Sequence, residues 1–215
     1  MSYQRLTRLF CLLLLGSTLS GCVVSENPVT AAKDSKLTKV VLGRWELTKP
    51  TSPLAWQRFV LEAASEEEKK LLQCPGLMHV WTEKQMDDQS WSRDEHLLCF
   101  VSDVGTYHYA NFYILPANEV FDHAKQQDTQ IKMILFRYTL KENELHVFFC
   151  DNEGFKQLAD PTKLPHDWLG EGYSRRPNLH ATSDQLQQAF KDKAYAERLF
   201  PDNGDFKHVY RRVAK

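Results

Sequence analysis

The chain has 215 residues, of which 42% are hydrophobic and 26% are charged, and its formal net charge at pH 7 is −1. A chain this close to neutrality lacks the excess of Lys and Arg that characterises nucleic-acid-binding domains, so we exclude nucleic acid as a partner. The length fits one domain that can bury a substantial hydrophobic core.

The N-terminal segment has the pattern of a secretory signal. Arg5 and Arg8 precede the apolar run Leu9–Leu15, and the segment up to the end of this run contains no acidic residue. This order of basic and apolar residues is typical of an export signal. The run is too short for a membrane-spanning helix, which needs roughly 20 consecutive apolar residues.

The quartet Leu19-Ser20-Gly21-Cys22, which follows this run, resembles the lipobox of bacterial lipoproteins. The resemblance implies that residues 1–21 are a signal peptide removed during export, and that Cys22 is then acylated. Lipoproteins of this kind are triacylated, and two or more acyl chains anchor a protein stably to a membrane. Because Val23 rather than Asp follows the cysteine, the resemblance also implies the outer membrane of the cell envelope.

Residues 22–38 are rich in Ser, Thr, Ala and Lys. We predict that they form a flexible tether between the lipid and a domain over residues 39–215. An exported domain lies in an oxidising compartment, where Cys74, Cys99 and Cys150 allow one disulfide with three possible pairings, and we consider a bridge from Cys74 to Cys99 or to Cys150. The two latter cysteines lie in apolar runs, so we expect them to be buried rather than catalytic. The cysteine spacings match no zinc motif.

The first patterned element of the domain is the β-rich run Lys39–Leu47, which predicts a strand. Residues 54–61 fit either a second short strand or a packing segment. Ser65 and Glu68 have the spacing of a capping box, which predicts a short early helix ending near Leu72. Runs bounded by turn residues predict further strands over residues 77–83, 95–103 and 106–115.

The clearest hairpin pairs residues 131–140 with residues 145–150, because apolar and polar residues alternate along its first strand. A long polar loop is expected over Asp160–Thr182. The capping residues at the end of this loop predict one late helix, which ends near Pro201. A last strand is predicted over residues 206–213.

The order of elements and two short motifs resemble a lipocalin-like bacterial lipoprotein. Gly43 and Trp45 form a Gly-x-Trp motif in the first strand, and Arg211 and Arg212 lie in the last strand, after the late helix. The resemblance implies a mainly β fold, namely an antiparallel lipocalin-like β-barrel of about eight strands with a short early helix and one late α-helix. It also implies that Trp45 lies at the barrel floor, where Arg211 or Arg212 stacks on its indole ring.

Sequence motifs of catalysis and metal binding are missing. The chain contains no Gly-x-Ser-x-Gly, no His-Glu-x-x-His, no glycine-rich phosphate loop and no EF-hand loop. We therefore predict a non-enzymatic protein with no metal and no cofactor. A set of aromatic residues on the predicted strands either lines a ligand cavity or fills the barrel. These residues are Trp81, Phe100, Tyr107, Tyr109, Phe112, Phe136, Tyr138 and Phe148.

The sequence thus predicts an envelope lipoprotein that faces the periplasm and is held to the membrane by its lipid anchor. Its barrel is expected to bind a lipid or another small apolar ligand. The alternative is an envelope accessory protein with a filled barrel, whose loops, chiefly Asp160–Thr182, bind another envelope protein. A hydrolase is a third candidate, which would need convergent polar groups in a cleft.

Overall fold

The computed structural model describes residues 22–49, 56–126, 131–158, 164–170, 175–204 and 206–213. The predicted signal peptide, including the lipobox residues Leu19, Ser20 and Gly21, lies outside the described residues. In the part of the chain that is described, no helix is long and apolar enough to cross a membrane.

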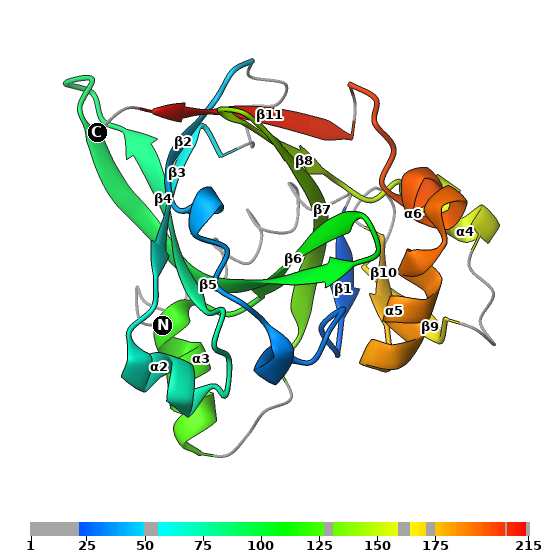
Figure 1. Cartoon of the computed structure of the whole chain (residues 1–215). Coiled ribbons are helices and arrows are strands. Elements are labelled where there is room, and N and C mark those ends of the chain that lie inside the picture. The colour runs from blue at the N-terminus through cyan, green and yellow to red at the C-terminus, as the bar shows by residue number, and fades with distance from the viewer. Residues whose placement is uncertain are drawn as a thin grey trace, which may run out of the picture.

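The described residues form a mainly β structure with eleven strands in one sheet and five α-helices (Figure 1). The mainly β prediction is confirmed, but the sheet has more strands than the eight or so that we expected. In chain order the strands are β1 (Val23–Ser25), β2 (Gly43–Leu47), β3 (Arg58–Ala63), β4 (Met78–Gln85), β5 (Trp91–Val104), β6 (Tyr107–Tyr113), β7 (Met133–Lys141), β8 (Glu144–Phe148), β9 (His166–Leu169), β10 (Arg176–Leu179) and β11 (Lys207–Val213).

Eight of these strands are joined edge to edge in a closed ring. Strands β2 to β6 pair in chain order, β6 pairs with β7, β7 with β8, β8 with β11, and β11 pairs with β2. Each of these pairings is antiparallel. The other three strands, β1, β10 and β9, extend the sheet from β7. Ring closure gives each of the eight strands two partners, which removes the free edges of an open sheet.

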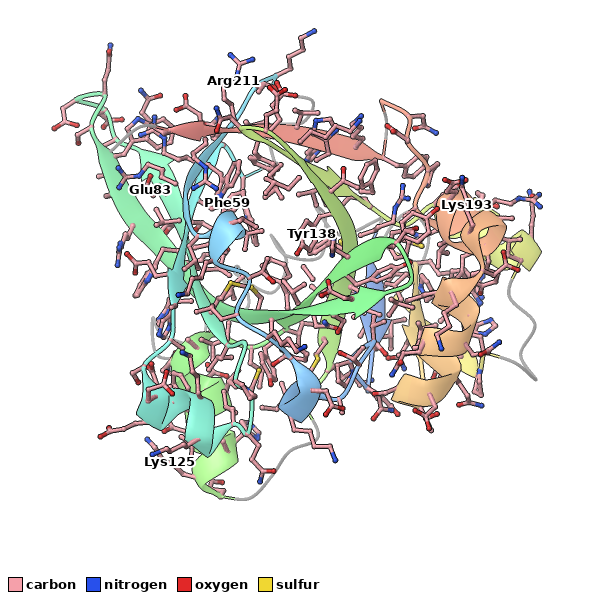
Figure 2. All side chains as sticks on the ribbon, in the orientation of Figure 1. Phe59, Glu83, Lys125, Tyr138, Lys193 and Arg211 are labelled. Carbon is pink, nitrogen blue, oxygen red and sulfur yellow. The ribbon has the colours of Figure 1, made fainter. Side chains whose placement is uncertain are left out.

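Side chains along each ring strand alternate between the interior of the ring and its outer face. On β7, Phe136 belongs to an interior cluster, whereas its neighbour Leu135 packs in a separate core with the helices. Figure 1 shows the five α-helices outside the ring. Figure 2 shows Phe59 and Tyr138 inside the ring and Arg211 pointing away from it.

Two capping boxes start helices where the sequence predicts them. Ser65 caps α2 (Glu66–Leu71) and Thr182 caps α5 (Ser183–Lys191). The prediction of one late helix is wrong, because Asp192 leaves the helical conformation and caps a second helix, α6 (Lys193–Leu199). The remaining helical segments are α3 (Ala117–Lys125), α4 (Asn152–Leu158) and the 3-10 turns η1 (Ala32–Asp34) and η2 (Lys39–Val41).

The late helices pack on the outer face of the ring through aromatic residues. The Tyr109 ring of β6 lies 4.9 Å from that of Phe190 in α5 and 5.8 Å from that of Phe200, which follows α6. Arg137 of β7 is buried in the same layer, where its Nη2 donates to the carbonyl oxygen of Phe200 at 2.6 Å. Its guanidinium also lies 4.2 Å from the ring of Phe148. This outer core therefore combines apolar burial with one stacked cation.

The predicted flexible tether over residues 22–38 is instead part of the fold. All three residues of β1 are buried, and β1 pairs antiparallel with β7 and parallel with β10. Farther along, the backbone N–H of Val29 donates to Asn111 Oδ1 at 2.9 Å, and Thr30 Oγ1 lies 2.7 Å from Ser102 Oγ. Asn111 and Ser102 are buried on the outer face of the ring, so this segment supplies partners that their polar groups need.

The predicted polar loop over Asp160–Thr182 is also partly ordered into strands. Its described part contains β9 and β10, and β10 pairs with β1 on one side and with β9 on the other. The pairing with β1 joins segments at opposite ends of the chain, so the local sequence gives no sign of it. The predicted strand over Lys39–Leu47 is shorter than expected, because its first three residues form η2.

The four described cysteines, Cys22, Cys74, Cys99 and Cys150, are buried free thiols. The pairing of Cys74 that the sequence left open does not form in the structure. Cys74 Sγ instead lies 3.3 Å from Ser35 Oγ. Burial raises the pKa of Cys74 to about 11 and that of Cys22 to about 12, so both thiols are protonated at neutral pH.

Candidate ligand-binding site

One end of the ring interior, which we call the closed end, is built around Trp45 and Arg212. Trp45 of β2 is fully buried, and its Nε1 donates to the carbonyl oxygen of Val41 in η2 at 2.8 Å. Arg212 of β11 places its Cζ atom 4.5 Å from the centroid of the Trp45 ring. Its guanidinium also donates to the carbonyl oxygens of Leu42, at 2.6 Å, and of Val40. These contacts hold η2 and the residue after it against this end of the ring.

Gly43 is required where Arg212 reaches the backbone before β2. Gly43 has a φ of +129°, and a Cβ atom at this position would lie 2.9 Å from Arg212 Nη1. Arg211, by contrast, points outward and lies 3.4 Å from Glu144. The choice between the two arginines is thus resolved, because Arg212 is directly opposite Trp45 in the β2–β11 register.

A small polar group lies on the interior-facing side of β5, β6 and β7. His108 Nδ1 is 2.6 Å from Asp103 Oδ1, and the His108 ring stacks at 5.3 Å on Tyr138. Tyr138 is buried, and burial raises its pKa above the usual range. His108 and Asp103 are exposed, so they form a solvated pair rather than a buried catalytic one.

The aromatic residues predicted to line a cavity are divided between the two faces of the ring. Successive residues of a strand point to opposite faces of the sheet, and the predicted set contained residues of both faces. Trp81 lies on the outer face, where its ring stacks 3.6 Å from that of His96. The outer core contains Phe100, Tyr107, Tyr109 and Phe148. The interior contains Phe112, Phe136 and Tyr138.

The interior also holds a closed series of ring contacts, which we call the aromatic circuit. Each ring in it contacts the next, with centroid separations between 4.5 and 6.3 Å, and the last contacts the first. The rings come from β3, β6, β7, β11 and the residues that flank β3 and β8. In contact order they are Trp56, Phe112, Phe136, Phe149, His208, Tyr210 and Phe59.

The aromatic circuit becomes solvent-accessible toward the end of the ring opposite Trp45. Trp56, Phe112, Phe149 and His208 are partly exposed, and we call the end that they form the open end. Phe136 is buried below them and clusters with Cys22. At one end of the ring interior, hydrogen bonds from Trp45 and Arg212 therefore hold η2 in place, whereas at the other end aromatic rings meet solvent.

His208 supplies the imidazole of the aromatic circuit. Its Nδ1 atom is buried and has no hydrogen-bond partner among the described residues. The ring lies 4.5 Å from that of Phe149, and burial lowers the pKa of His208. A lowered pKa favours the neutral imidazole at pH 7, which can accept or donate one hydrogen bond to a ligand.

A second group of titratable residues lies on the outer face of β4 and β5. His79 Nδ1 is 2.8 Å from His96 Nε2, and His79 Nε2 is 3.1 Å from Glu68 Oε2. Trp81 lies between His96 and Arg93, whose Cζ atom is 4.6 Å from the Trp81 ring. These contacts use the ring nitrogens of His79 internally. Among all described residues, no group of three or more His, Cys, Asp and Glu is placed to hold a metal ion.

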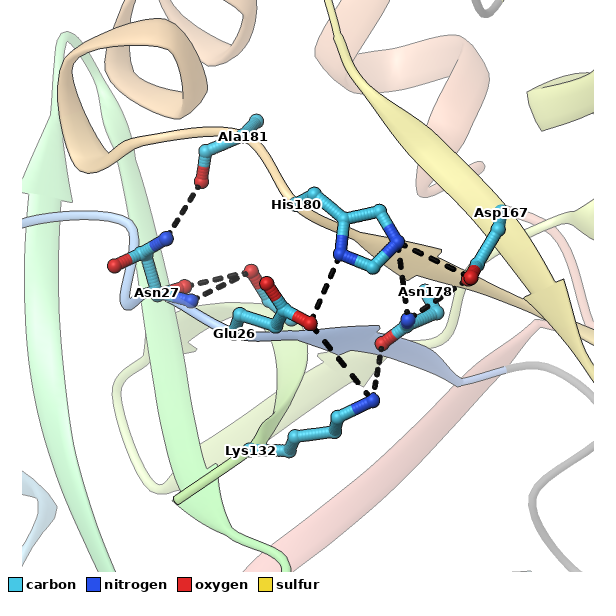
Figure 3. Close-up of polar contacts among 8 residues, drawn as sticks. Glu26, Asn27, Lys132, Asp167, Asn178, His180 and Ala181 are labelled. Atoms are coloured by element: carbon cyan, nitrogen blue, oxygen red, sulfur yellow. Dashed lines mark hydrogen bonds and ion pairs between the residues drawn. The ribbon is translucent and has the colours of Figure 1, made fainter. Parts of the chain in front are cut away.

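A third polar group joins the segment that follows β1 to β9 and β10 (Figure 3). His180 lies between two carboxylates, with Nδ1 2.9 Å from Glu26 and Nε2 3.2 Å from Asp167. Asn178 donates to Asp167 at 2.8 Å and accepts from Lys132 at 3.3 Å. The two carboxylates raise the pKa of His180. The group therefore fastens the segment after β1 in place and has no free ring nitrogen for chemistry.

The predicted lining set lacks five members of the aromatic circuit, namely Trp56, Phe59, Phe149, His208 and Tyr210. Alternation along the last strand was the available signal, because His208, Tyr210 and Arg212 share one face.

No protein-family model, no curated protein and no solved structure matches this chain.

Proposed function

We propose that this protein is an outer-membrane lipoprotein, anchored through acylated Cys22, whose ring of eight strands is a lipocalin-like barrel that binds an apolar ligand. The ligand occupies the interior at the aromatic circuit, and the protein performs no catalysis. Residues 1–21 serve as the signal peptide in this proposal, and the anchored domain lies on the periplasmic side of the membrane.

The aromatic circuit carries the proposal. An interior that only had to be filled would be expected to bury its aromatic rings, as the closed end buries Trp45. At the open end, Trp56, Phe112 and Phe149 instead remain partly exposed. Aromatic side chains that line a site and remain partly accessible to water are typical of small-molecule sites.

The chemistry of the aromatic circuit favours an elongated apolar molecule such as an acyl chain. Its members contribute no carboxylate and no guanidinium, so a charged ligand would lose its hydration without gaining an ion pair. The buried Nδ1 atom of His208 has no hydrogen-bond partner in the described part of the chain, and burial lowers the pKa of this imidazole, which favours its neutral form. We therefore expect a ligand with an apolar chain and one uncharged or weakly polar hydrogen-bonding group.

The test is ligand occupancy of the full chain with a matched pair of variants. Ala110 of β6 lies partly buried in the interior, so Ala110→Trp would fill space next to the aromatic circuit. Ala124→Trp, on α3 outside the ring, is the control. Wild type and the control should bind methyl cis-parinarate, a fluorescent acyl chain whose ester group is uncharged, and carry lipid detected by native mass spectrometry, whereas Ala110→Trp should lose at least tenfold in affinity. No binding by wild type, or equal binding by both variants, would overturn the proposal.

The anchor is tested separately by Cys22→Ser. The protein should move from the membrane fraction to the soluble fraction, because the acyl chains are the only membrane attachment in this proposal. Retention of Cys22→Ser in the membrane fraction would disprove the lipid anchor.

A further inference from the structure

We infer that the open end of the ring faces the bilayer, so that the aromatic circuit lies against the lipid surface that holds the protein. The inference rests on the proposed anchor at Cys22. It adds an orientation and a source of ligand, namely the phospholipid bilayer in which the protein is anchored.

The position of Cys22 carries the first step. Cys22 is fully buried and forms an interior cluster with Ile134 and Phe136, against which Phe112 and Phe149 pack. Three of these residues belong to the aromatic circuit. A chain attached to Cys22 Sγ therefore starts beside the circuit, and the partly exposed rings at the open end mark the direction in which the interior meets solvent.

The second step is that Cys22 is held close to the sheet, with no flexible segment between the two. Val23, directly after Cys22, pairs with Leu135 of β7, and Val24 pairs with both Ile134 and Asn178. The anchoring residue is thus fixed to the sheet and is not separated from it by a flexible tether. With the anchor held this closely, the orientation of the ring relative to the bilayer is restricted to those that bring the neighbourhood of Cys22 to the lipid.

The apolar residues at the open end are suited to a position at the membrane interface. Trp56, two residues before β3, is partly exposed, and Met86, 48% exposed, lies in the turn between β4 and β5. The β3–β4 register pairs Arg58 with Glu83, so this turn extends past the start of β3 on the side of Trp56. Partly exposed indole and thioether side chains are suited to the boundary between headgroups and acyl chains.

Two exposed residues at opposite ends provide a matched test. Val40, 58% exposed, lies in η2 at the closed end, whereas Met86 lies at the open end. The acylated full chain, with Val40→Trp or Met86→Trp, is reconstituted into phosphatidylcholine–phosphatidylglycerol vesicles that contain brominated acyl chains. Bromine quenches indole emission only at close range, so the added emission reports which end meets lipid.

We expect the emission added by Met86→Trp to be quenched at least twice as strongly as that added by Val40→Trp. Replacing Trp56 by Phe should remove quenchable emission, and Trp81→Phe, on the outer face, should not. Equal quenching of the two added indoles, or stronger quenching at Val40, would overturn the orientation while leaving the anchor intact. Persistence of Cys22→Ser in the membrane fraction would instead remove the anchor and the orientation together.

Discussion

The two ends of the ring interior differ in the kind of interaction that holds them. At the closed end, Trp45 and Arg212 are fixed by hydrogen bonds to the backbone around η2. At the open end, Phe112 and Phe149 contact other rings and solvent. Directional polar contacts specify one geometry, whereas ring contacts tolerate rearrangement. We therefore expect the closed end to maintain the fold, and the proposed ligand to occupy the open end.

The largest effect is expected when the closed end loses its central side chain. Trp45→Ala removes a fully buried indole and should lower the free energy of unfolding by about 3–5 kcal/mol. Urea denaturation followed by circular dichroism measures this loss. Trp81→Ala, which truncates a partly exposed indole on the outer face, is the control and should cost clearly less. Equal losses would show that the closed end has no special structural role.

The two adjacent arginines of β11 provide the next comparison. Arg212→Ala removes the stacking on Trp45 and leaves the carbonyl oxygens of Val40 and Leu42 without this donor, so we expect a loss of about 2–3 kcal/mol in unfolding free energy. Arg211→Ala removes an exposed side chain and should change stability by less than about 0.5 kcal/mol. Thermal and urea unfolding of both variants would settle the contrast, and a similar effect for the two would refute it.

Variants of two neighbouring phenylalanines, Phe148 and Phe149, should separate the proposed ligand binding from stability. Phe149→Leu alters the open end and should weaken binding of methyl cis-parinarate about three- to tenfold with little loss of stability. Phe148→Leu alters the outer core, where Phe148 packs under Arg137, and should lower stability by about 1 kcal/mol without changing affinity. Fluorescence titration and urea unfolding give the two readouts. A loss of affinity seen only in Phe148→Leu would place the ligand in the outer core and contradict the proposed site in the ring interior.

The smallest effect is expected at His180, outside both ends. Its pKa is raised in the folded state, so its ion pairs contribute stability below its ordinary pKa of about 6.5, and this contribution is lost as pH rises through the folded pKa. Wild type should therefore exceed His180→Gln in melting temperature more at pH 5 than at pH 9. The other polar groups near the His180 imidazole are Lys132, Asn178 and the carboxylates of Glu26 and Asp167. A pH-independent difference between the two proteins would exclude the linkage.

Several strands and helices could be predicted because the sequence patterns that specify them are local. The capping boxes at Ser65 and Thr182, and the alternation through Ile134 and Phe136, depend on residues a few positions apart. The cavity-lining set was less successful. It selected aromatic residues by type and so combined Phe148 of the outer core with Phe112 of the interior.

By itself, the sequence determined the mainly β class, the starts of α2 and α5, and the Gly-x-Trp and Arg pattern, because backbone periodicity and capping boxes are local properties. Tertiary structure decided the rest. A segment rich in Ser, Thr and Lys became β1 and its continuation, because buried Asn111 and Ser102 on distant strands need its polar atoms. Ring closure also decided which aromatic residues share the interior, since only the register between strands brings Trp56, Phe112 and His208 to the same end.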